Sequence, residues 1–233
     1  MFHTSRRLLL LALLSTAAAH GARAQEQQPA ETKEAAYTRT ITERAAKIVA
    51  SLTPLDAAKA PKVRDLLVGQ YRQLNDLQEA HKTQLAALKA QPQAEQTAEA
   101  KKKLEDQNTA ALDKLHGQYL QQLGRYLTPA QIDQVKNGMT YSVLPITMHA
   151  YEDMLPNLTE AQKSQMLAWL TEAREHAMDA GTSQEKHAWF GKYKGRINNY
   201  LSAAGIDMNQ AGKDWQARIA ARKEAAAAPA TKQ

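Results

Sequence analysis

The sequence predicts an all-α protein in which a long antiparallel helical hairpin precedes a compact bundle of shorter helices. Ala, Gln, Leu, Lys and Glu dominate the composition, and apolar residues recur at helical spacing. Two long periodic stretches flank a short polar segment that contains a proline, which predicts the hairpin. We expect one domain over residues 25–226, with the hairpin at about 62–126 and the bundle at about 127–226.

The N-terminus predicts a secretory signal peptide over residues 1–24. The features are a basic start at Arg6 and Arg7, an apolar run over 8–19, and small residues at Ala22 and Ala24. The apolar run is too short for a stable membrane anchor, and no later segment has the length and apolarity of a membrane span. We therefore expect a periplasmic or secreted protein that is soluble after cleavage.

Charge and cysteine content exclude several classes of site. The chain has no cysteine, which excludes disulfides, thiolate metal sites and a cysteine nucleophile. The formal charge is +6, but the signal peptide carries Arg6, Arg7 and Arg23 and no acid, so the mature chain carries only +3. Because acidic and basic residues are interspersed, we expect no nucleic-acid partner.

The N-terminal half reads as three helices. After a polar leader, a helix is expected at about 32–51, with Ile41, Ala45, Ile48 and Val49 on one face. The hairpin helices follow at about 62–90 and 97–126, and Pro61 suits the first turn of the earlier one. His81 falls on the apolar stripe of that helix, where we expect a packed or edge residue rather than a ligand.

The C-terminal half reads as shorter helices and an irregular segment. A helix beginning at Thr128 should end near Gly138, and residues 141–157 should be irregular because of Pro145 and Pro156. The remaining expectations are a helix from Leu158 ended by Gly181, a helix capped by Thr182 and Glu185 and closed by Gly205, a last helix at about 209–224, and a disordered tail at 227–233.

A repeated L-T-x-x-Q pattern marks helix starts. It occurs at 127–131 and 158–162, and residues 52–56 are a near copy. The threonine serves as N-cap, Gln or Asp three residues on reaches back to the N-cap amide, and Pro54 and Pro129 suit the first helical position. Leu127 can pack against Ile132. The pattern is similar to that of the periplasmic chaperones of the Spy and CpxP type, which bind unfolding proteins in a concave helical cradle.

Longer strings resemble a bacterial family known as domain-of-unknown-function family 3826. They include "RAAKIVASL" (44–52), "KVRDLLVGQYRQLND" (62–76), "VKNGMTYSVLPIT" (135–147), "YEDMLPNLTEAQK" (151–163), "AWLTEAREHAMDAG" (168–181) and "WFGKYKGRINNYLSAAGIDM" (189–208). These strings spread over most of the mature chain. The family is exported, has no established enzymatic activity, and has been described as sugar-binding. The resemblance therefore implies a carbohydrate-related role and assigns no ligand residues.

The stretch 187–205 divides into three faces when phased as a helix. A core face holds six residues: Phe190, Tyr193, Ile197, Tyr200, Leu201 and Ala204. Gly191 and Gly195 form a notch that receives either a neighbouring helix or a ligand, because interior helical glycines usually mark close backbone approach. A third face holds Trp189, Lys192, Arg196 and Asn199.

This third face predicts a carbohydrate site without catalysis or cofactors. An aromatic ring covers the apolar face of a pyranose, and Arg pairs a carboxylate, so an acidic sugar is a candidate ligand. The expected site residues are Tyr141, Tyr151, Trp169, Arg174, Trp189, Lys192, Arg196 and Asn199, with the notch at Gly191 and Gly195.

Three alternatives stay open at this stage. A metal would use Glu172 and His176 with a third ligand from elsewhere, although ion pairs of these acids with Lys192, Lys194 and Arg196 are simpler. A hydrolase would need two facing carboxylates from Glu152, Asp153, Glu172, Glu175 and Asp179. A Spy-like chaperone would expose an apolar concave face on the hairpin and form a homodimer.

Overall fold

The computed structural model describes residues 31–90 and 94–227, without the side chains of 94–96. These residues form eight α-helices and no strand, so the all-α prediction is confirmed. The predicted signal peptide and nearly all of the predicted tail lie outside the described residues. None of the described helices is long and apolar enough to cross a membrane.

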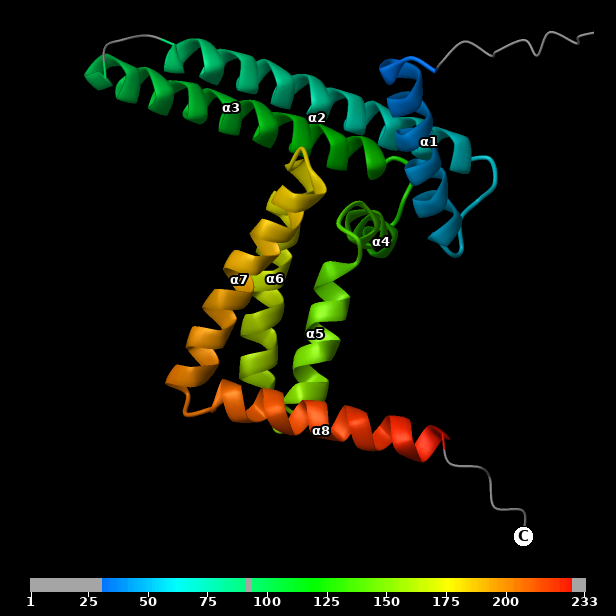
Figure 1. The fold of residues 1–233 in the computed structure, drawn as a ribbon. Coiled ribbons are helices and arrows are strands. Elements are labelled where there is room, and N and C mark those ends of the chain that lie inside the picture. The colour runs from blue at the N-terminus through cyan, green and yellow to red at the C-terminus, as the bar shows by residue number, and fades with distance from the viewer. Residues whose placement is uncertain (1–30, 91–93, 228–233) are drawn as a thin grey trace, which may run out of the picture.

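The eight helices follow the expected order with one addition. They are α1 (Lys33–Ser51), α2 (Ala60–Lys89), α3 (Ala94–Leu123), α4 (Pro129–Met139), α5 (Val143–Met154), α6 (Glu160–Asp179), α7 (Ser183–Ala203) and α8 (Met208–Ala227). Figure 1 shows α2 and α3 side by side as a long antiparallel hairpin, which α1 crosses near its open end, where α2 begins and α3 ends.

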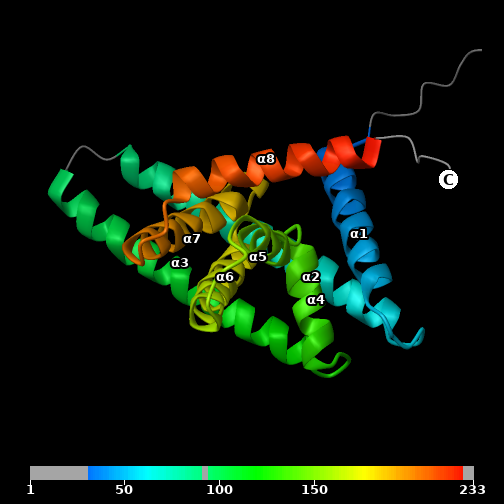
Figure 2. The ribbon, with the colours of Figure 1, turned by 90° about the horizontal axis from the view of Figure 1, so that it is seen from below.

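The bundle stands beneath the hairpin. Helices α6 and α7 form an antiparallel pair whose connecting turn reaches the hairpin, and α5 packs beside α6 (Figure 1). Figure 2 views α5 and α6 nearly along their axes. Helix α8 crosses the end of the bundle away from the hairpin and contacts α5 and α7. The α6–α7 turn is therefore the place where hairpin and bundle meet.

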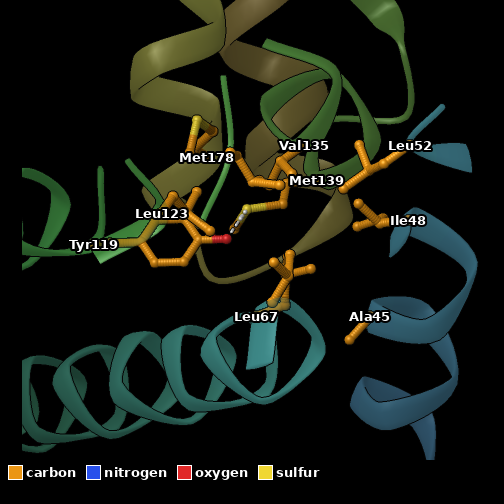
Figure 3. Close-up of a cluster of buried hydrophobic side chains, with 11 residues drawn as sticks. Ala45, Ile48, Leu52, Leu67, Tyr119, Leu123, Val135, Met139 and Met178 are labelled. Carbon is orange, nitrogen blue, oxygen red and sulfur yellow. Dashed lines mark hydrogen bonds between the residues drawn. The ribbon is translucent and has the colours of Figure 1, made fainter. Parts of the chain in front are cut away.

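One core cluster joins α1, α2, α3 and α4, as Figure 3 shows. Leu67, Leu123 and Val135 are fully buried there, and the Tyr119 hydroxyl donates to Met139 Sδ at 3.4 Å. Met178 from α6 enters the same cluster. Because a bundle side chain completes the hairpin core, the two parts share buried apolar surface.

A second cluster fills the bundle between α5, α6 and α7. The core face predicted for residues 187–205 is confirmed at Phe190, Tyr193, Ile197 and Leu201, which are all buried. Tyr200 is half-buried against the same cluster, and Ala204 is exposed. The phasing was therefore right along the length of α7 and lost accuracy only at its last turn.

Threonine capping is confirmed at three helix starts. Thr128, Thr159 and Thr182 each form a full capping box with the residue three positions on. The near copy at Thr53 is different, because no helix begins there and α2 starts only at Ala60. Asp56 instead accepts from the Ala58 amide at 2.9 Å, a local turn that replaces the expected cap.

The expectation of an irregular segment at 141–157 was wrong, because α5 occupies most of it. Pro145 is the third residue of α5. The first four amide groups of a helix have no partner within the helix, so a proline there removes no hydrogen bond. Pro156 follows the end of α5 at Met154, where a proline is equally tolerated.

The two predicted glycine stops have different outcomes. Gly205 has φ of +86° and closes α7 as expected. Gly181 is not a left-handed cap, because α6 ends at Ala180 in an extended conformation with φ of −69° and ψ of 141°. A Cβ at Gly181 would lie 3.1 Å from Gln78 Cγ, so its small size lets the α6–α7 turn pack against α2.

Candidate functional site

A cleft of about 400 Å³ lies where the α6–α7 turn meets the hairpin. We call it the interhelical cleft. It is lined by Gln78 of α2, by Thr109, Leu112 and Asp113 of α3, and by His176, Asp179, Ala180, Glu185 and Trp189 of the α6–α7 region. One wall is aromatic, because the His176 and Trp189 rings stack with centroids 4.4 Å apart and planes 17° apart.

The polar groups of the interhelical cleft are mostly acceptors. Thr109 and Asp113 are exposed and make no hydrogen bond with the described residues. The buried Oδ1 of Asp179 also has no hydrogen-bond partner there. Gln78 Nε2 is already engaged, since it donates to the Asp179 carbonyl at 3.1 Å. The cleft therefore combines an aromatic wall with free oxygen acceptors, which suits a ligand rich in hydroxyl groups.

His116 fixes one edge of the interhelical cleft. Its Nδ1 lies 2.8 Å from Asp179 Oδ2, and its Nε2 lies 3.2 Å from Glu175 Oε2. Hydrogen bonds to Asp179 and then to Glu175 raise the pKa of His116 from 6.5 to about 9, although burial opposes the shift. A charged imidazole thus clamps α3 to α6 and orients the Asp179 carboxylate.

Glu175 is the centre of a wider charge network. Burial raises its pKa, but hydrogen bonds from His116 and Lys136 outweigh burial and lower the pKa to about 2. Lys136 Nζ lies 2.7 Å from Glu175 Oε2, which ties α4 to α6. The network joins α3, α4 and α6 below the hairpin, so its role is to position these helices.

Sequence reasoning missed His116, Thr109 and Asp113. His116 lies four residues after Leu112 and three before Tyr119, so it sits beside the predicted apolar stripe of α3. This position beside the buried face was the available indication that His116 contacts another helix. Its two acidic partners lie on α6, more than fifty residues away, and no local pattern pairs them.

Two predicted site residues are buried structural groups. Arg174 is only 5% exposed, and its guanidinium donates to Asp133 at 2.8 Å and to Asn137 at 3.0 Å. Tyr151 is 7% exposed, and its hydroxyl donates to Asn198 Oδ1 at 2.6 Å. Because their polar groups are satisfied inside the protein, the prediction that they contact a ligand fits this structure poorly.

Four other predicted residues, Trp169, Trp189, Lys192 and Arg196, make ring contacts on and between α6 and α7. Arg196 lies over the Trp169 ring at 4.5 Å and within 3.9 Å of Glu172, while Lys192 lies 5.1 Å from the Trp189 ring. We call the residues joined by these contacts the aromatic strip: Trp169, Glu172, His176, Trp189, Lys192, Arg196 and Tyr200. Asn199 is exposed on α7 without a hydrogen bond to the described residues. The strip leads into the interhelical cleft, because His176 and Trp189 belong to both.

Tyr141 lies elsewhere. It is 42% exposed, and its ring stacks on His187 with centroids 5.6 Å apart. It lines a separate small cavity on the other side of the α6–α7 turn. The eight predicted residues therefore do not converge on one site: Trp189 alone lines the cleft, and Trp169, Lys192 and Arg196 extend it.

The glycine notch receives no helix. A Cβ built on Gly191 or Gly195 would meet no described atom within 4 Å, and both residues are exposed. Of the two alternatives that the sequence left open, close packing by a neighbouring helix is therefore excluded among the described residues. The two glycines lie on the solvent side of α7, about 200° around the helix from Trp189 and Tyr193 respectively.

The predicted ion pairs of the α6 acids were only partly right. Glu172 approaches Arg196, but Glu175 and Asp179 pair with His116, Lys136 and Arg174 rather than with Lys192 or Lys194. Within the described residues no group of three His, Asp or Glu side chains is arranged to hold a metal ion. Of the carboxylates considered for hydrolysis, Asp153 binds Arg222 and the Trp215 indole, outside the interhelical cleft.

Comparison with known proteins supports the family resemblance and adds no activity. A search of curated proteins gave no match. The profile of the family described as "Protein of unknown function (DUF3826)" matches residues 38–221. The matched span runs from α1 into α8 and includes every residue of the interhelical cleft and the aromatic strip. The chain therefore belongs to this family of uncharacterised proteins.

Proposed function

We propose that this protein is an exported, non-catalytic binding protein for neutral oligosaccharides. The single observation that carries the proposal is the aromatic wall of Trp189 and His176 in a cleft of about 400 Å³ with free acceptors opposite. A flat ring covers the apolar C–H face of a pyranose, and carboxylate and hydroxyl oxygens accept hydrogen bonds from sugar hydroxyls. The predicted signal peptide supports an exported location.

The charge of the interhelical cleft favours a neutral sugar over an acidic one. Asp113, Asp179 and Glu185 line it, and no Lys or Arg of the described residues does. A sugar carboxylate placed there would meet like charge, which is unfavourable at short range. The cations of the aromatic strip, Lys192 and Arg196, already lie over tryptophan rings.

The length of the aromatic strip favours an oligosaccharide over a single ring. Trp169 and His176 are seven residues apart on α6, which corresponds to roughly 10.5 Å along the helix. Each has an aromatic partner on α7, Tyr200 and Trp189. Two aromatic platforms at this separation can contact different rings of the same chain.

The surface gives little support to the chaperone alternative. The large hydrophobic side chains that are exposed among the described residues are Tyr141, Ile146 and Leu167, and none belongs to the hairpin. A cradle for unfolding proteins needs a continuous exposed apolar face. Suppression of client aggregation without any glycan binding would nevertheless favour a chaperone.

A glycan array followed by calorimetry tests the proposal. The array should contain neutral, N-acetylated and uronate oligosaccharides, and we expect the full chain to bind neutral members. Trp189→Ala should weaken binding about tenfold, since an aromatic contact contributes about 0.5–1.5 kcal/mol beyond the apolar area it buries and about 1.4 kcal/mol is a tenfold change. Trp215→Ala on α8 is the matched control and should leave affinity unchanged. Retention of uronates alone would contradict the neutral-ligand proposal.

A further inference from the structure

A second cavity, of about 70 Å³, lies on the opposite side of the α6–α7 turn from the interhelical cleft. Tyr37 and Arg44 of α1, Tyr71 and Asn75 of α2, Tyr141 before α5 and Lys186 of α7 all line it. It is much smaller than the cleft of about 400 Å³, so it suits a head group rather than a whole sugar ring. The charged residues that line it are cations, whereas carboxylates line the interhelical cleft.

Two cations face this small cavity, and no carboxylate of the described residues lines it. Lys186 is 7% exposed, and its Nζ donates to the carbonyls of Ala177 at 2.8 Å and Met178 at 3.0 Å. An ammonium has three N–H groups, so one of them has no acceptor among the described residues. Arg44 makes no hydrogen bond or ion pair with those residues.

The two cations are close enough to affect each other. Burial is the main cause that lowers the pKa of Lys186 from 10.5 to about 8, and the charge of Arg44 adds to it. Asp179 and Glu185 oppose the shift, but neither reaches the ammonium: Asp179 pairs with His116, and Glu185 caps α7. Lys186 is buried whereas Arg44 is exposed, and a bound anion would offset the repulsion between these two like charges.

Neutral donors and a strained turn complete the small cavity. The Tyr71 hydroxyl and the Asn75 amide have no hydrogen-bond partner among the described residues, whereas Tyr37 donates to the Tyr71 carbonyl at 2.9 Å. Tyr141 and Ser142 both adopt left-handed φ angles, 57° and 55°. Such strain in non-glycine residues costs about 1–2 kcal/mol each and concentrates at ligand sites.

We propose that this cavity is an oxyanion site, in which Arg44 and Lys186 bind a carboxylate or a phosphate-like group and Tyr71 and Asn75 donate to its remaining oxygens. Guanidinium binds both planar carboxylates and tetrahedral phosphate through paired N–H groups. The exposed Tyr141–His187 ring stack at the rim covers the organic part of such a ligand. The site takes an anionic group, whereas the interhelical cleft favours a neutral ligand.

Titration with acetate and inorganic phosphate at constant ionic strength tests the oxyanion site. Nuclear magnetic resonance of the full chain should show saturable shifts with one or both anions, and comparison of the two distinguishes carboxylate from phosphate chemistry. Arg44→Gln should weaken binding at least about tenfold, because hydrogen bonds to charged groups are worth more than neutral ones. The matched control is Arg125→Gln, which removes an exposed arginine remote from the cavity.

Two further measurements make the outcome decisive. Lys186→Met keeps the apolar stem and should also weaken anion binding; if that variant fails to fold, Arg44→Gln alone decides. Neutral oligosaccharide binding should survive Arg44→Gln, which separates this site from the interhelical cleft. Equal anion affinity in wild type, Arg44→Gln and Arg125→Gln, or no saturable binding of either anion, would overturn the oxyanion site.

Discussion

His116 joins the hairpin to the bundle, and its replacement by glutamine should reduce stability in a pH-dependent way. The pKa of His116 is raised from 6.5 to about 9 by Asp179 and Glu175. At about 1.36 kcal/mol per pH unit, this difference corresponds to at most about 3.4 kcal/mol. The side chain keeps 17% exposure, and Glu175 retains Lys136 as a partner. We therefore expect a loss of about 1–2 kcal/mol.

The sign of the pH dependence follows from the direction of the pKa shift. A raised pKa means that the folded protein favours the protonated imidazole. The contribution is fully present below pH 6.5 and is lost as the pH rises through about 9. Lys186 acts in the opposite direction, because its pKa is lowered to about 8 and its contribution rises between about pH 8 and 10.5. Lys186 is present in both proteins, so subtracting their stabilities largely removes its effect.

Urea unfolding of the full chain and of His116→Gln at about pH 6 and pH 10 measures this contribution. The difference in the free energy of unfolding should fall by more than half at the higher pH. His149→Gln, an exposed histidine of α5, serves as the control and should change little at either pH. An equal loss at both pH values, or an NMR titration midpoint for His116 near 6.5, would refute the clamp.

Five other substitutions test local packing and helix capping by urea or thermal unfolding. Gly191→Ala and Gly195→Ala should each raise the free energy of unfolding by about 0.5–1 kcal/mol, because an added Cβ meets nothing within 4 Å; destabilisation would mean that the notch is filled. Thr128→Ala should cost about 1 kcal/mol because it removes the N-cap of α4, whereas Thr53→Ala should cost far less. Equal losses would mean that Thr53 also caps a helix. Gly138→Ala should cost about 1–3 kcal/mol, since its Cβ would lie 2.8 Å from Ile48 Cγ1, and an unchanged melting temperature would contradict that contact.

Local patterns predicted the helices and most of their starts. Apolar spacing located the buried faces of α1 and α7, and the threonine motif located the caps at Thr128 and Thr159. The failures at α5 and Thr53 share a cause. Proline is compatible both with a first helical turn and with a non-helical turn, and the surrounding packing decides between them.

The site was harder to predict because long-range contacts define it. Helical phasing placed Trp189, Lys192 and Arg196 on one face, and the structure brings them onto the aromatic strip. Phasing cannot show that Arg174 donates hydrogen bonds to Asp133, or that Tyr151 donates one to Asn198. Phasing also cannot show that α3 packs against α6, so the contribution of α3 to the lining of the cleft was not predicted.

The three tryptophan indole signals give the most direct test of carbohydrate binding. The chain contains Trp169, Trp189 and Trp215, and the Trp215 indole is held by Asp153 at 2.6 Å, remote from the cleft. In a titration of the ¹⁵N-labelled full chain with a neutral oligosaccharide from the array, we predict saturable shifts of the Trp189 and Trp169 indole N–H signals and a stationary Trp215 signal. Saturable binding that leaves Trp189 unmoved, or moves all three equally, would contradict a sugar site in the interhelical cleft.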